Sequence, residues 1–182
     1  VAASALVGAL QTIASRTVDP IKSVVVSVTQ FHAGEAYNII PEDVVLRGTA
    51  RSFEPEIQAA IEPAMRRIID GIAAAMGVAA ELDYRRGYPP LVNHAGESAF
   101  AAGIAADIVG AGNVDTSPDP KMGAEDFSYM LNERPGAYIW IGNGPGESGC
   151  SLHNPNYDFN DQALPLGASY WARLAETRLA RR

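Results

Sequence analysis

Residues 23–31 read Ser-Val-Val-Val-Ser-Val-Thr-Gln-Phe, and this β-branched stretch predicts a strand. Residues 43–51 predict a second strand, and the loop between the two strands makes an antiparallel hairpin the simplest arrangement. Upstream of the hairpin, residues 1–16 predict a helix, because the apolar residues follow helical spacing at Leu6, Leu10 and Ile13. The chain therefore begins with a helix that leads into a hairpin.

Downstream of the hairpin lies the clearest amphipathic helix of the chain. Its apolar residues recur at spacings of four, four, three and four, at Ile57, Ile61, Met65, Ile68 and Ile72. Pro63 is expected to kink this helix or loosen its first turns, and Gly77 is placed to end it. Residues 78–86 predict a third strand.

Residues 1–86 thus follow the order α-β-β-α-β. One additional strand in front would complete β-α-β-β-α-β, the split βαβ (ferredoxin-like) pattern. The chain begins at Val1 and carries no charged leader and no cleavage motif, so its start does not resemble a signal peptide. We therefore expect it to be the later part of a longer polypeptide.

Gly87-Tyr88-Pro89-Pro90 predicts a boundary, which gives two domains, 1–86 and 87–182. The second part predicts an α/β segment that ends in a helix. Its helices are expected at 95–109, 125–131 and 164–182, its buried strand at 137–142, and a glycine-rich loop at 142–149.

Composition excludes several classes of protein. The chain has 182 residues, of which 47% are hydrophobic and 19% charged, and this balance excludes a disordered tail. A net charge of −7, with no dense Lys/Arg run, argues against a nucleic-acid binder, and no apolar stretch is long enough for a membrane helix. The single cysteine, Cys150, excludes an intrachain disulfide and favours a cytoplasmic location.

Six residues are candidates for chemistry, and each has a plainer alternative. His153 lies at a loop tip that a metal or substrate could reach, although a lone loop histidine is more often simply exposed. His32 and Asn38 could donate hydrogen bonds to a developing oxyanion, or could merely shape a turn. Arg51 could bind a substrate carboxylate, or form a surface ion pair.

Glu125 and Asp126 begin a predicted helix. They could serve in acid–base catalysis or metal coordination, or only complement the helix dipole. His94 is interpreted as structural. Cys150 lies near His153 in the sequence, but a catalytic Cys–His pair requires a geometry that spacing does not supply, so an inert loop thiol is the alternative.

Taken together, the residues of these motifs and their order along the chain resemble those of a known family. Residues 32–41 (His-Ala-Gly-x-Ala-x-Asn-Ile-Ile-Pro) and 47–53 (Arg-Gly-Thr-Ala-Arg-Ser-Phe) resemble the amidohydrolase branch of the two-metal aminoacylase/carboxypeptidase family. This branch includes hippurate hydrolases, N-acyl-amino-acid amidohydrolases and auxin-conjugate hydrolases. Further matches follow in the same order over essentially the whole chain: Gly87 to Asn93, Met122 to Phe127, Pro135 to Ala137 and Leu152 to Phe159.

The resemblance implies a catalytic α/β domain with two divalent ions and an inserted lid that commonly mediates dimerisation. Residues 1–86 would form most of the lid, and residues 87–182 the C-terminal part of the catalytic domain. The substrate would be an N-acyl amino acid, and the ions zinc, manganese, cobalt or nickel. The protein is expected to form a homodimer through the lid, without nucleic acid or membrane as a partner.

The resemblance also assigns roles to residues. His153 matches the last metal ligand, His32 the lid histidine that polarises the scissile carbonyl, and Asn38 its neighbour near the substrate. Arg51 matches an arginine that receives the substrate carboxylate. Glu125 and Asp126 match a Glu-Asp-Phe motif that supports the site.

This sequence departs from the family pattern by lacking the Cys-x-His ligands, the Glu-Glu pair with the general base, and a further ligand histidine. We therefore predict that this chain alone is inactive and holds no catalytic metal tightly, because one histidine is too few ligands. The alternative hypothesis is a non-catalytic dimerisation or binding module, since one fold hosts many functions.

Overall fold

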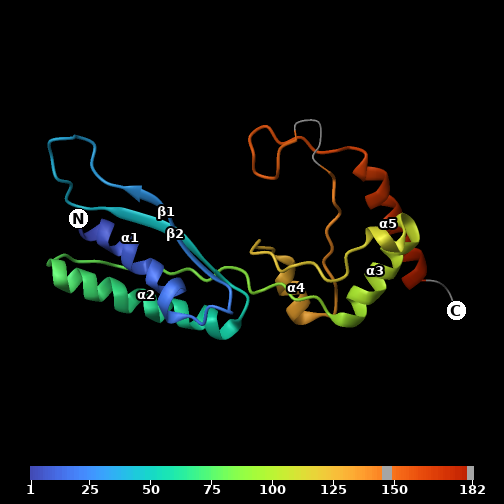
Figure 1. Ribbon diagram of the computed structural model, residues 1–182, viewed down its shortest axis with the longest axis horizontal. Coiled ribbons are helices and arrows are strands. Elements are labelled where there is room, and N and C mark those ends of the chain that lie inside the picture. Colours follow the sequence, from blue (N-terminus) through green and yellow to red (C-terminus); the bar gives the residue numbers. More distant parts are fainter. Residues whose placement is uncertain (145–148, 180–182) are drawn as a thin grey trace. The chain divides into compact units, whose positions relative to one another are not determined.

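The computed structural model describes residues 1–144 and 149–179 and divides the chain into two units (Figure 1). Unit 1 comprises Val1–Pro90 with Met122–Ala124, and unit 2 comprises Leu91–Lys121 with Glu125–Arg182. Unit 1 therefore extends beyond the expected boundary at residue 86. The interpretation of the two parts as a lid and a portion of a catalytic domain stays a prediction.

Unit 1 contains the predicted hairpin, which the structure confirms. Strands β1 (Val24–His32) and β2 (Val45–Ser52) pair antiparallel, with Val24 opposite Ser52 and His32 opposite Val45. A bulge interrupts the ladder between Val28 and Gln30. A Cβ atom on Gly48 would clash with the main-chain oxygen of Ser27, so only glycine fits beside the bulge.

Two helices pack on the hairpin, α1 (Ala2–Thr12) and α2 (Pro55–Met76). A π-helical turn, η1 (Ile13–Thr17), follows α1 directly. The buried core of unit 1 consists of aliphatic side chains from all these elements except β2: Leu10, Ile13, Val26, Ile61 and Ala64. Most of them lie on the apolar faces that helical and strand spacing predicted.

The end of α2 agrees with its sequence. The helix continues through Pro63 and stops before Gly77, whose φ of 67° is the left-handed conformation that glycine adopts without steric cost. The N–H groups of Gly77 and Val78 both donate to the main-chain oxygen of Ala73.

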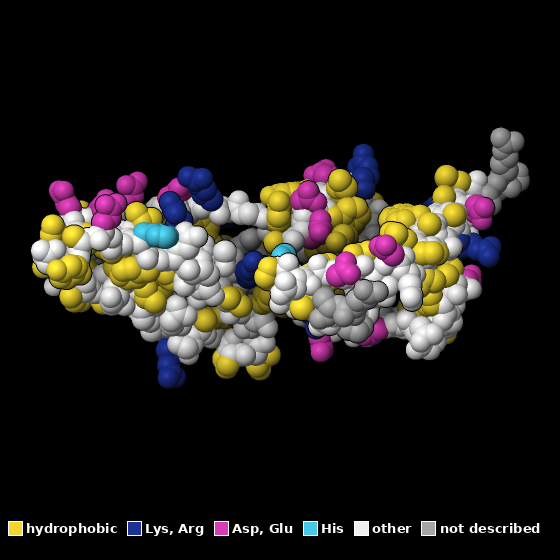
Figure 2. All heavy atoms as spheres, turned by 90° about the horizontal axis from the view of Figure 1, so that it is seen from above, with side chains coloured by type: hydrophobic (Ala, Val, Ile, Leu, Met, Phe, Trp, Pro, Cys, Tyr) yellow, Lys and Arg dark blue, Asp and Glu magenta, His cyan; other side chains and the backbone are white. Residues whose placement is uncertain are grey.

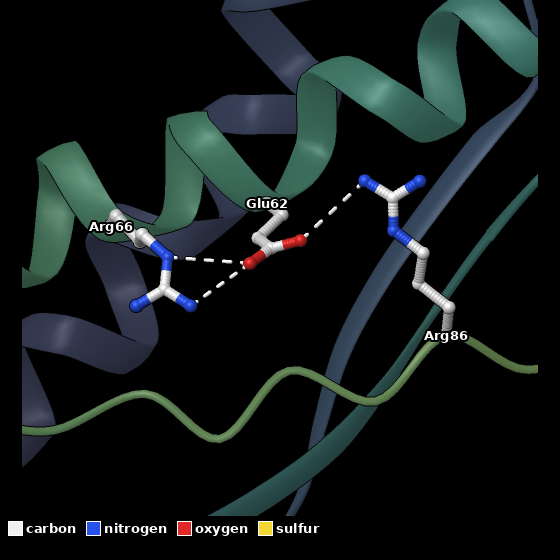
Figure 3. Close-up of polar contacts among 3 residues, drawn as sticks. All are labelled: Glu62, Arg66 and Arg86. Carbon is white, nitrogen blue, oxygen red and sulfur yellow. Dashed lines mark hydrogen bonds and ion pairs between the residues drawn. The ribbon is translucent and has the colours of Figure 1, made fainter.

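The predicted strand over residues 78–86 is wrong in this structure, which shows α-β-β-α here. A strand requires a hydrogen-bonded neighbour, and among the described residues the sheet consists of β1 and β2 alone. Tyr84 instead packs against the core of unit 1. Glu62 of α2 binds Arg66 at 2.9 Å and Arg86 at 3.6 Å, which ties this segment to the helix (Figure 3).

Unit 2 contains α3 (Ala95–Val109), α4 (Phe127–Glu133) and α5 (Ala163–Arg178), with a short 3₁₀ turn, η2 (Ala111–Asn113), after α3. The three predicted helices are confirmed, with ends shifted by a few residues. Helix α3 packs against α5, and Arg178 of α5 lies 5.4 Å from the ring centre of Phe100 and 3.6 Å from Glu97. The last three residues of the predicted final helix lie outside the described residues.

The predicted buried strand over residues 137–142 is also wrong. This segment forms no strand in the described structure, and the side chain of Trp140 is 68% exposed. The amide of Asn93 takes the place of a partner strand, since its Oδ1 accepts from the N–H of Tyr138 at 2.8 Å and its Nδ2 donates to the carbonyl of Tyr138 at 2.9 Å. Both bonds go to the main chain of Tyr138, so Asn93 does not extend a ladder along this segment.

Candidate functional site

His32 and Asn38 lie at one end of the hairpin in unit 1. His32 is the last residue of β1, and Asn38 lies in the loop 33–44 that connects the strands; both side chains are exposed. In the same loop Tyr37 and Ile40 are almost fully exposed, at 104% and 93%. Hydrophobic side chains are likewise visible on the surface in Figure 2. This end of the hairpin therefore offers polar donors beside apolar contact area.

Arg51 lies near the opposite end of the hairpin. It pairs with Val25, whereas His32 pairs with Val45, so the two candidates are separated by roughly 20 Å of strand. The guanidinium of Arg51 donates through Nη1 to the main-chain oxygen of Met122. The hairpin therefore does not bring His32 and Arg51 into one cluster.

Glu125 lies just before α4 in unit 2 and accepts two hydrogen bonds. Its carboxylate accepts from the hydroxyl of Tyr138 at 3.0 Å and from the N–H of Phe127 at 3.5 Å. The hydrogen bond from Tyr138 lowers the pKa of Glu125, while the same carboxylate raises the pKa of Tyr138. Glu125 is thus held as a carboxylate.

Asp126 directly precedes α4 and is exposed, and its side chain makes no capping hydrogen bond to the helix. The neighbouring Ser128 is fully buried and donates to the main-chain oxygen of Glu125 at 2.7 Å. The structure thus places both acidic residues at a helix start, as predicted. Their supporting role stays a prediction.

His153 lies on an exposed turn of unit 2. The N–H of Asn154 donates to the main-chain oxygen of Ser151 at 3.2 Å, so His153 occupies the third position of this turn. Its φ is 69°, a left-handed value that residues with a Cβ rarely adopt. The glycine-rich loop before it lies partly outside the described residues, which omit 145–148.

The candidates fall into two sets. His32, Asn38 and Arg51 belong to unit 1, while Glu125, Asp126 and His153 belong to unit 2. Within residues 1–144 and 149–179, no group of three or more His, Cys, Asp or Glu side chains could hold a metal ion. His153 fits one position of a metal site, but the described donor set does not complete one.

Sequence reasoning missed the polar residues that brace unit 2. Asn93 and Tyr138 fix the segment before the glycine-rich loop. The main-chain N–H of His94 donates to the carbonyl of Gly136 at 3.0 Å, and the N–H of Gly136 donates to Nδ1 of His94 at 3.3 Å. Asparagine and tyrosine carry no periodic signal, so their partners could not be inferred from spacing. The structural interpretation of His94 agrees with these bonds.

No helix in the described part of the chain is both long and apolar enough to cross a membrane.

Comparison with known proteins gives consistent results. The sequence profile of peptidase family M20/M25/M40 matches residues 3–177. The chain is 36% identical over 174 residues to the hippurate hydrolase of Campylobacter jejuni, covering 96% of this chain and 45% of that protein. It is 34% identical over 174 residues to the N-acetylcysteine deacetylase of Bacillus subtilis, covering 96% and 44%.

A solved structure agrees with these matches. A Bacillus subtilis protein described as a dinuclear metal binding peptidase from the M20 family superposes with a TM-score of 0.71 at 30% identity, covering 100% of this chain and 46% of that one. The chain therefore spans a little less than half the length of these relatives.

Proposed function

The chain belongs to peptidase family M20/M25/M40, and on that premise we propose that its protein hydrolyses the amide bond of N-acyl amino acids with the help of two divalent metal ions. One observation carries this proposal. The family match runs from residue 3 to residue 177 and so includes both the hairpin loop with His32 and Asn38 and the turn with His153.

The relatives support the choice of substrate. The hippurate hydrolase and the N-acetylcysteine deacetylase are both named for reactions on acylated amino acids. Hydrolysis of such a substrate would release a carboxylic acid and an amino acid. The identity of the acyl group and of the amino acid is not part of the proposal, because no described side chain sets a pocket size or charge.

The metal requirement rests on the relatives and on His153. A solved relative is described as a dinuclear metal binding peptidase, and an exposed imidazole is a suitable ligand for zinc, manganese, cobalt or nickel. The chemistry that such ions supply is Lewis-acid activation of water and of the scissile carbonyl. His153 would contribute one ligand, so the described residues alone would hold the ions weakly.

His32 and Asn38 would act on the substrate carbonyl. Both side chains are exposed at the end of β1, and both can donate a hydrogen bond to the oxygen on which negative charge develops. We assign them to a partner subunit's site in a homodimer formed through a lid of residues 1–86. The exposed Tyr37 and Ile40 beside them support such a contact surface.

Arg51 would bind the substrate carboxylate. A guanidinium carries five N–H donors, and the bond to the carbonyl of Met122 engages Nη1. Donors on the other nitrogens are suited to a bidentate contact with a carboxylate. The acidic residues Glu125 and Asp126 would support the site from unit 2.

A cytoplasmic location is also proposed, and it rests on the single cysteine.

The first test uses a longer polypeptide, in which this sequence is joined to the part of a family member that it does not cover. We call it the family-length polypeptide. We expect it to hydrolyse N-acyl amino acids and to lose activity when a chelator removes the metal. If it dimerises but shows no chelator-sensitive hydrolysis, the proposed function is wrong and the non-catalytic module is favoured.

A second test concerns His32. His32→Ala should lower turnover about 100-fold or more while the metal content stays unchanged, because an oxyanion donor is lost but no ligand. Glu35→Gln, on the same exposed loop, is the matched control and should leave turnover unchanged. Equal turnover in wild type and His32→Ala would remove the assigned role.

A further inference from the structure

Asn143 forms hydrogen bonds with Tyr157 and Asn160, two residues that follow His153 in the chain. Its side-chain Nδ2 donates to the hydroxyl of Tyr157 at 2.6 Å, and its main-chain oxygen accepts from Nδ2 of Asn160 at 2.9 Å. All three residues are half-buried, whereas residues 151–156 are exposed. Water competes less with half-buried hydrogen bonds, so we expect these two bonds to be more stable than contacts among the exposed residues 151–156.

Asn160 in turn is fixed to α5. Its Oδ1 accepts from the N–H of Gln162 at 3.1 Å, and its main-chain oxygen accepts from the N–H of Ala163 at 2.9 Å. Ala163 is buried and begins α5, which packs against α3. Through Asn160, Asn143 is therefore held in a fixed position relative to α5 and α3.

Two consecutive turns connect His153 to Tyr157. The first holds His153 at its left-handed φ of 69°, and in the second the N–H of Tyr157 donates to the main-chain oxygen of Asn154 at 2.9 Å. Pro155 occupies the second position of the latter turn, where its fixed φ is favoured. The short path from Tyr157 to His153 thus has little freedom, and a shift of Tyr157 would move the imidazole.

We propose that Asn143 is a positioning residue for His153, acting through its hydrogen bonds to Tyr157 and Asn160. The inference rests on the proposed function, in which His153 binds a metal ion. An exposed ligand has no packing around it to fix its orientation, so the clamp of Asn143, Tyr157 and Asn160 would do so. Groups that hydrogen-bond a ligand directly typically change metal affinity 10–100-fold when they are removed, and Asn143, which acts through Tyr157, should lie at the low end of this range.

The experiment measures zinc dissociation constants by chelator competition in the family-length polypeptide. Asn143→Ala is expected to weaken zinc binding at the His153 position about 10-fold or more. Tyr157→Phe should weaken it in the same direction. The double variant should bind zinc about as tightly as the weaker of the two single variants, because both substitutions remove the same hydrogen bond. Asn113→Ala is the matched control, because this residue also donates from Nδ2 to a main-chain oxygen in unit 2, that of Val109.

A cycle with His153→Ala decides whether Asn143 acts through the histidine. In the His153→Ala background, Asn143→Ala should have no further effect on zinc affinity. An equal loss in both backgrounds, or an unchanged affinity in Asn143→Ala, would overturn the inference. The zinc measurement does not depend on turnover, so a polypeptide that binds zinc through His153 but hydrolyses nothing would refute the proposed function and leave the inference standing.

A second measurement on the 182-residue chain tests the clamp without metal. Asn143→Ala should speed amide hydrogen exchange at Asn154 and Tyr157, whose N–H groups form the two turns, and should leave exchange in α3 unchanged. Unchanged exchange at both turn amides would contradict the clamp. Faster exchange throughout α3 would show that Asn143 acts on the whole unit, which would also contradict it.

Discussion

The two units are stabilised in different ways. In unit 1 a hairpin and two helices pack around a core of buried aliphatic side chains, whereas in unit 2 hydrogen bonds of asparagine and tyrosine hold the extended segments. In unit 1 the stabilising residues recur with helical or strand spacing. In unit 2 the polar braces join residues far apart in sequence, such as Asn93 with Tyr138 and Asn143 with Asn160. The comparison teaches that nonperiodic polar residues can hold segments for which the sequence pattern predicted a strand.

The largest expected effect tests the apolar core of unit 1. Ile61 is 1% exposed and lies within that core, so Ile61→Ala should lower the free energy of unfolding by about 2–5 kcal/mol. Chemical denaturation measures the loss. Hydrogen exchange should accelerate in α2 while α3 keeps its protection; equal acceleration in both helices would show that the two units do not unfold separately.

The next effect tests the polar bracing of unit 2. Asn93→Ala leaves the N–H and the carbonyl of Tyr138 without their side-chain partner and should cost about 1–3 kcal/mol. Exchange of the Tyr138 amide should rise. Asn93→Asp keeps the acceptor but places a carboxylate oxygen opposite the carbonyl of Tyr138 at neutral pH, so it should not restore the lost stability. If Asn93→Ala reduced hydrogen-exchange protection only in unit 1, the conclusion that polar side chains stabilise unit 2 would be wrong.

A smaller effect follows pH. The bond from Tyr138 lowers the pKa of Glu125, so it stabilises the fold above pH 4.5 and is lost as pH falls through the lowered pKa. The raised pKa of Tyr138 means that its contribution is present below pH 10.0 and is lost as pH rises through that pKa. Tyr138→Phe should therefore be less stable than wild type between pH 4.5 and pH 10.0. The difference should shrink as pH falls through the lowered pKa of Glu125 or rises through the raised pKa of Tyr138. A difference that is independent of pH would point to packing instead.

The smallest effect concerns the ion pair of Glu62 and Arg86 (Figure 3). The side chain of Arg86 is 62% exposed, so solvent screens the pair and Arg86→Ala should change stability by less than about 1 kcal/mol. Repeating the denaturation in about 1 M salt should abolish even that difference. A loss above about 2 kcal/mol would mean that segment 78–86 depends on this contact more than on Tyr84.

The candidate site was predictable to different degrees. The loop with His153 followed from the glycine-rich stretch before it and Pro155 after it, and the hairpin with His32 followed from β-branched residues on both sides of a loop. The contact of Arg51 with the carbonyl of Met122 could not be predicted, because the two residues are far apart in sequence and a main-chain acceptor has no side-chain signature. The roles of these residues come from family membership and stay proposals.

The sequence by itself determined the helices and the hairpin, since their apolar spacing and the glycine that ends α2 are local properties of the chain. It also determined the family, through motifs that run along the whole chain. Only the tertiary structure decided that residues 78–86 and 137–142 are not strands. A strand depends on the hydrogen-bonding groups of a neighbour, and for Tyr138 that neighbour is the amide of Asn93.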